Sequence, residues 1–164
     1  MSWCLVAGFS INGRACPARL FTPLRGKARF SMLHPDLAAV LVQKADQDLY
    51  VLAKMVGDEE APVEIFGFHA QQATEKLVKA LLARGKIPYT RTHRLGELVD
   101  LATDNGIGLP DGIEFLVDLT PYAVEFRYDV TPDDGYDELD KEGVLEQVRS
   151  LRSWVANATG ISAP

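Results

Sequence analysis

One predicted helix constrains the fold of this chain more than any other feature. Residues 66–85 read FGFHAQQATEKLVKALLARG, and their apolar side chains recur at three- and four-residue steps, the period of a helix with one buried face. Much of that stripe is alanine, which lets another helix approach closely, while larger side chains contribute roughly 25 cal/mol per Å² buried. The stripe consists of Phe66, Ala70, Ala73, Leu77 and Leu81.

The polar side chains of the same helix also follow a pattern. At 100° per residue, His69, Gln72 and Lys76 fall together along one edge of the apolar stripe. A polar edge half in and half out of the core is where we expect a binding site.

Four further helices are expected, over residues 35–56, 92–105, 113–128 and 136–157, with the central helix over 62–84. Thr92 is the expected N-cap of the third, and Pro121 is expected to kink the fourth. No strand pattern or internal repeat occurs, so the sequence predicts an all-α, up-and-down bundle of four to five helices. The side chains expected to face inward include Leu37, Leu41, Ala45, Leu49, Leu52 and Val56 in the first helix, Leu95, Leu98, Val99 and Ala102 in the third, Phe115, Leu116, Leu119, Ala123 and Phe126 in the fourth, and Leu139, Val144, Val148, Leu151 and Val155 in the last.

The charge is distributed unevenly along the chain. The 164 residues carry a net charge of −6, but residues 1–31 hold five cations and no acid, so residues 32–164 carry −6 − 5 = −11. An acidic body does not attract nucleic acid non-specifically, because phosphate binding needs a cationic patch that displaces counterions. We therefore expect any nucleic-acid contact to be local.

Residues 1–31 show no helical or alternating period and are punctuated by glycine and proline. We expect a disordered or loosely docked basic leader, which is either a functional arm or the product of an upstream start codon, followed by one domain over 32–164. Both cysteines, Cys4 and Cys16, lie in the leader and are expected to remain thiols. With no secretory signal and no apolar run of about eighteen residues, the sequence predicts a cytoplasmic protein that does not enter a membrane.

Two further polar residues are candidates for supporting a site. Asp48 lies on the shoulder of the first helix's apolar stripe, where it could accept a hydrogen bond from an inward-facing arginine. His93 follows Thr92, where local hydrogen bonding and a site role are both open. No pair of histidines or cysteines has metal-ligand spacing, so no metal site and no resident cofactor are predicted.

Four segments together resemble the HEPN domain family: ADQDLYVL, FHAQQATEKLVKALL, THRL and YAVEFRYD. The resemblance covers roughly residues 32–159 and is most specific in the second segment, whose polar residues helix propensity does not demand. It implies a compact helical bundle that commonly forms homodimers. It also implies action beside a small nucleotidyltransferase, in a pair like those of toxins and antitoxins, or nucleotide binding.

A ribonuclease branch of this family uses an arginine followed four to six residues later by a histidine. Arg127 matches the arginine, but the downstream positions are Pro132, Asp133 and Asp134, and the histidine is missing. No downstream group can then exchange a proton near neutral pH, and Asp133 and Asp134 would repel phosphate. The departure argues against ribonuclease activity and against assigning a catalytic residue.

The resemblance carries over only Arg127 and Tyr128. Arg127 is either a last-turn cation favoured by the helix dipole or a ligand for phosphate or Asp48. Tyr128 is either packed at the rim of the core or, as in part of the family, presented to the transferase for modification.

Three functional hypotheses follow. The first is a non-enzymatic HEPN-type protein that binds a nucleotide or a nucleotidyltransferase partner through His69, Gln72, Lys76, Arg127 and Tyr128. The second is a divergent HEPN ribonuclease toxin in which His69 or His93 replaces the missing histidine across a dimer interface. The third is a helical scaffolding module without a small ligand.

Overall fold

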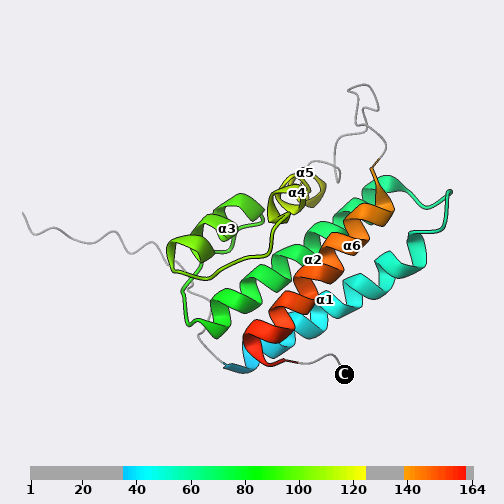
Figure 1. Cartoon of the computed structure of the whole chain (residues 1–164). Helices are drawn as coiled ribbons and strands as arrows, with labels where there is room; N and C mark the ends of the chain where they lie inside the picture. The colour runs from blue at the N-terminus through cyan, green and yellow to red at the C-terminus, as the bar shows by residue number, and fades with distance from the viewer. Residues whose placement is uncertain (1–34, 125–138, 162–164) are drawn as a thin grey trace, which may run out of the picture.

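The computed structural model describes residues 35–124 and 139–161, and every regular element in these two ranges is a helix. This confirms the predicted all-α bundle. Figure 1 shows three long helices lying side by side, with the shorter helices along one of them. The elements are α1 (Pro35–Met55), α2 (Val63–Arg84), α3 (Leu95–Asp104), α4 (Ile113–Val117), α5 (Pro121–Val124) and α6 (Lys141–Thr159).

The long helices α1, α2 and α6 pack against one another. Lys141, at the start of α6, donates from Nζ to the carbonyls of Asp58 (3.1 Å) and Ala61 (2.8 Å), just before α2 begins. At the other end, Arg84 Nε donates to the carbonyl of Thr159 (3.3 Å). The helices α2 and α6 therefore run in the same direction, and α1 runs opposite to both.

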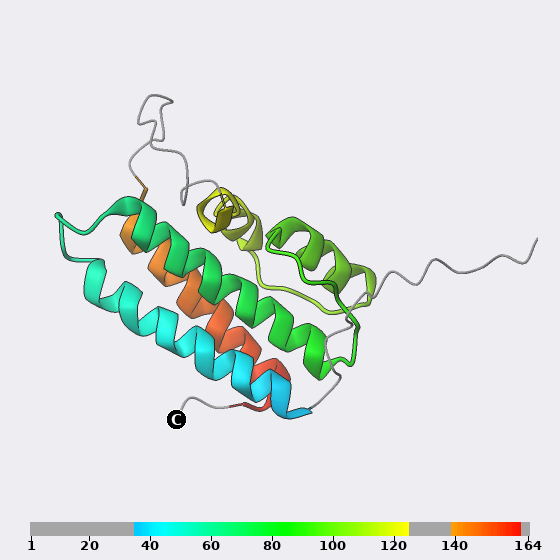
Figure 2. The same ribbon diagram turned by 180° about the vertical axis from the view of Figure 1, so that it is seen from behind.

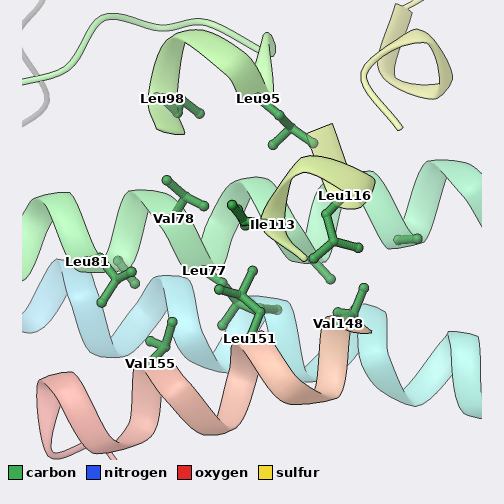
Figure 3. Packing of buried hydrophobic residues seen from close by; sticks show 14 of the residues in the cluster. Leu77, Val78, Leu81, Leu95, Leu98, Ile113, Leu116, Val148, Leu151 and Val155 are labelled. Atoms are coloured by element: carbon green, nitrogen blue, oxygen red, sulfur yellow. The ribbon is translucent and has the colours of Figure 1, made fainter. Parts of the chain in front are cut away.

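The short helices α3, α4 and α5 lie along the side of α2 that faces away from α1, and α4 also packs against α6. Figure 3 shows the consequence inside the core, where Leu77 lies beside Leu151 of α6 while Val78 points towards α3. At α5 the approach is closer, because Gly67 lies against the ring of Tyr122 with no room for a Cβ atom.

The central helix α2 is buried on more than the one face that its stripe predicts. The whole apolar stripe is buried, but so are Gln71, Thr74 and Glu75 on other faces. Both the long helices α1 and α6 and the short helices α3 to α5 pack on α2, so polar side chains of α2 are buried as well. The expectation of a single buried face was wrong for this reason.

Two boundaries and one face also differ from the expectations. In α1 the most buried residues are Ala38, Val42, Ala45 and Leu52, while Leu37, Leu41, Leu49 and Val56 are only partly buried. The third helix begins at Leu95 rather than at a Thr92 cap, since Thr92 Oγ1 accepts from the amide of Arg94 (3.1 Å) in a turn before it. In the last helix, α6 starts at Lys141 because the carboxylate of Asp140 caps it, accepting from Gly143 N (2.9 Å).

The segment predicted as one kinked helix over 113–128 is instead two short helices joined by a turn, as far as the described residues reach. Pro121 begins α5 rather than bending a longer helix, which suits its fixed φ and missing N–H. Because α4 ends at Val117, Leu116 and Leu119 are buried while Phe115 is 44% exposed, and the inward position expected for Phe115 was wrong. Phe126 lies outside the described residues.

Within the described residues, no helix is long and apolar enough to cross a membrane.

Candidate functional site

The polar edge of α2 meets α1 at one carboxylate. Asp48 of α1 receives Lys76 Nζ on Oδ2 (2.6 Å) and contacts His69 Nδ1 through Oδ1 (3.0 Å). The side chain of Asp48 is 13% exposed, whereas those of His69 and Lys76 are 25% and 22% exposed. The ring of Phe68 lies edge-on to His69, with 5.4 Å between ring centroids. A carboxylate on α1 thus fixes two partly exposed groups on α2.

The sequence placed Asp48 near an inward-facing arginine, and its partners among the described residues are instead His69 and Lys76. An inward-facing arginine does occur on α6, but Arg152 binds Asp46, two residues earlier on α1, with Nε to Oδ1 at 2.6 Å and Nη2 to Oδ2 at 3.1 Å. Asp46 and Asp48 both lie beside the apolar stripe of α1, and the helical period alone does not show which side chain each of them binds.

From Lys76 a chain of hydrogen bonds runs around α2. Lys76 Nζ donates to Gln72 Oε1 (3.3 Å), and Gln72 Nε2 donates to Gln71 Oε1 (2.7 Å). Gln71 Nε2 then donates to Glu75 Oε2 (3.0 Å). Each amide therefore points its donor away from the lysine and towards the carboxylate.

The far end of this chain binds the segment between α2 and α3. Glu75 accepts from Lys79 Nζ on Oε1 (2.7 Å) and contacts His93 Nδ1 through Oε2 (3.1 Å). Lys79 Nζ also donates to the carbonyl of Thr92 (2.8 Å), and Gln71 Nε2 to the carbonyl of His93 (3.1 Å). We call these four contacts of Gln71, Glu75 and Lys79 the loop anchor. His93 itself is 62% exposed, so its ring closes over the anchor from the solvent side.

The charge of the loop anchor is balanced within it. Burial alone would raise the pKa of Glu75, but hydrogen bonds from Lys79 and Gln71, the charge of Lys79 and the contact with His93 outweigh burial and lower it. Glu75 is therefore ionised at neutral pH. In the described part of the chain, every buried polar side-chain atom has a hydrogen-bond partner, so the network is complete.

This network explains the polar residues of HAQQATEK that packing does not require. His69, Gln72 and Lys76 lie along one edge of α2, as the helical wheel predicts. Asp48 bridges His69 and Lys76, and His93 lies at the far end of the network. Sequence reasoning missed Gln71, Glu75 and Lys79 because it treated α2 as buried on one side. The four-residue spacing of Gln71, Glu75 and Lys79 was the available signal, since such residues are neighbours on a helix.

Arg127 and Tyr128 lie outside the described residues, so their place relative to this network is a prediction. Residues 35–124 and 139–161 contain no cluster of three His, Cys, Asp or Glu side chains that could hold a metal ion. An open hollow between the α1–α2 connection and the start of α6 is lined by none of the predicted site residues.

One family model covers this arrangement, a long α1–α2 hairpin with the FHAQQATEK segment in the middle of α2. The HEPN domain model matches residues 38–158, from the first turn of α1 to the end of α6. The chain belongs to the HEPN domain family. No curated protein and no solved structure matches the chain.

Membership of the HEPN family gives the polar network its setting. The matched range includes every residue of the loop anchor and also Asp48, His69 and Lys76. A general HEPN-type role therefore rests on the family match, while the specific ligand or partner has to be argued from the side chains.

Proposed function

We propose that this HEPN protein is a non-enzymatic binding protein whose α2 edge, formed by His69, Gln72 and Lys76, receives a nucleotide or another phosphate-bearing ligand. One observation carries the proposal: two partly exposed nitrogen groups are fixed side by side on Asp48. Groups held in place before binding lose less conformational freedom when a ligand arrives.

The donors left over after folding suit a phosphate. The ammonium of Lys76 has three N–H donors, of which Asp48 and Gln72 use two, so one remains. His69 uses Nδ1 at Asp48, which leaves Nε2 for a ligand.

Isothermal titration calorimetry with ATP tests this binding. The double variant Lys76→Gln and Arg127→Gln should weaken ATP binding by about tenfold or more, because charge-assisted phosphate contacts are lost. Lys44→Gln is the matched control, since Lys44 is exposed on α1 and its ammonium donates to Gln47 of the same helix. ATP affinity that is the same in the double variant and in wild type, with unchanged circular dichroism, would refute the proposal.

We further propose a small nucleotidyltransferase as the protein partner, in a pair of the toxin–antitoxin kind, with the chain itself acting as a homodimer. The family match supports this setting at the general level. Co-expression and co-purification with a transferase encoded by an adjacent gene test the pairing. Intact-mass measurement after incubation with that transferase and ATP tests whether Tyr128 is modified, and light scattering gives the oligomeric state.

A second candidate, a divergent ribonuclease toxin, is favoured by one specific contact. A carboxylate that binds Nδ1 of a histidine orients the ring and leaves Nε2 for proton transfer, and His69 and His93 both have such a carboxylate. Ribonuclease activity and toxicity on expression should then vanish in Arg127→Ala and in His69→Ala or His93→Ala. RNA that stays intact with the wild-type dimer excludes this candidate.

A further inference from the structure

The segment between α2 and α3 is the most basic part of an acidic domain. Residues 85–94, here called the basic loop, contain Lys86, Arg91 and Arg94 and no acid. Residues 32–164 hold 12 cations, that is 17 minus the five of the leader, against 23 acids, so one quarter of the cations lie in this short loop. Such concentration creates a local positive potential on a surface of opposite sign.

The cations of the basic loop are directed to solvent. Lys86, Arg91 and Arg94 are all exposed, and neither Lys86 nor Arg91 has an ion-pair partner among the described residues. Arg94 contacts Glu97 at 3.4 Å, but both side chains are more than half exposed and such pairs contribute little. The charge of the loop is therefore available to a partner.

The loop is also held in place at the point where these charges lie. The loop anchor binds the carbonyls of Thr92 and His93 and the ring of His93, the residues between Arg91 and Arg94. At its start, Ile87 N donates to Leu82 O (2.9 Å). The buried carboxylate of Glu75 and the partly buried ammonium of Lys79 thus hold a loop that lies on the surface. The backbone that carries the cations therefore has a defined shape.

The surroundings of the loop limit the kind of anion that fits. Directly after it, α3 exposes Glu97, Asp100 and Asp104. A nucleic-acid strand carries a charge at every nucleotide and would be repelled once it extended beyond the loop, while a short acidic peptide ends within the patch. We infer that the basic loop is a docking surface for an acidic segment of a partner protein.

Fluorescence anisotropy with a labelled oligoglutamate peptide and the full chain tests this inference. Arg91→Glu with Arg94→Glu should weaken peptide binding by about tenfold or more at low ionic strength, and salt should weaken the wild-type complex. Both side chains are exposed, so the fold should persist. Lys44→Glu with Lys54→Glu, which makes the same change of charge on α1, is the matched control and should alter binding by less than about twofold.

A second variant separates a shaped docking surface from general attraction. Glu75→Gln with Lys79→Met removes the loop anchor's ion pair and leaves the net charge unchanged, since one acid and one base are lost. Peptide binding should weaken several-fold, and hydrogen exchange at Thr92 and His93 should become faster. Peptide binding equal to that of wild type in a folded anchor variant would overturn the inference.

Two other results would also overturn it. One is equal weakening by the α1 control variant, which would mean that only net charge matters. The other is a single-stranded oligonucleotide of matched charge binding as tightly as the peptide, which would make the loop a nucleic-acid surface. The inference does not depend on the phosphate ligand of His69 and Lys76, because His69→Gln should leave peptide binding unchanged.

Discussion

Glu75 brings a carboxylate into the centre of the bundle, and this makes part of the stability depend on pH. Its pKa is lowered below the ordinary value of 4.5, so the folded state favours the ionised form more than the unfolded chain does. The stabilisation is fully present above about pH 4.5 and is lost as the pH falls through the lowered pKa. Urea unfolding between neutral and acidic pH should show this loss. The double variant Glu75→Gln and Lys79→Met should show a flatter dependence, and an identical dependence would contradict the assignment.

Gly67 is a residue whose role is set by a single neighbour. A Cβ atom at this position would overlap the buried ring of Tyr122, and the ring has little space in which to move. Gly67→Ala should therefore destabilise the protein by about 1–3 kcal/mol, the usual cost of overpacking. Thermal unfolding measures the change. Gly57→Ala is the control, because a Cβ atom there meets nothing within 4 Å, and an equal melting temperature for the two variants would count against this packing.

At the same scale, some site residues could be predicted and others could not. His69, Gln72 and Lys76 were found because a wheel shows which residues of one helix share an edge. Their partner Asp48 was found as a candidate, but its contacts with His69 and Lys76 were not foreseen, since they depend on how α1 turns against α2. Gln71 was missed because a fully buried amide is recognised only when its acceptors from another segment are known.

Among the elements, α6 shows how a side chain sets the start of a helix. Asp140 Oδ1 accepts from Gly143 N at 2.9 Å, and the carboxylate also lies where the helix dipole favours negative charge. Asp140→Ala should lower the unfolding free energy by about 1 kcal/mol. Asp140→Asn keeps the hydrogen-bond acceptor and should lose much less. Denaturant titration of both variants measures the difference, and equal losses would show that charge alone is responsible.

Long helices were predicted to within a few residues, whereas the region of α3 to α5 was not. In α1 and α2 many apolar positions follow the helical period, so one residue that departs from it does not change the predicted helix. In α4 and α5 only a few residues determine where each helix begins and ends. The turn that separates Val117 from Pro121 depends on how these helices pack on α2 and α6. Phe115 was assigned to the core because its spacing fits a longer helix than the one that forms.

On the scale of the whole molecule, the first and last long helices are joined by an ion pair. Arg152 of α6 is buried and binds Asp46 of α1 through two nitrogen–oxygen contacts, and its Nη1 also donates to the carbonyl of Ile161 (3.4 Å). These contacts link the start of the described chain to its end. Since α1 packs against both α2 and α6, unfolding of α1 should expose the surfaces of α2 and α6 that it covers at the same time.

Removing one member of this pair should cost more than removing both. Arg152→Met leaves the Asp46 carboxylate beside an apolar surface, and Asp46→Leu leaves a guanidinium buried without its partner, so each should destabilise the protein by about 2–3 kcal/mol. In the double variant neither charge is stranded, and the loss should be smaller than the sum of the single losses by about 1 kcal/mol or more. Denaturant unfolding of the four proteins of this cycle gives the coupling. Strictly additive losses would mean that α1 and α6 are held together by their apolar contacts alone.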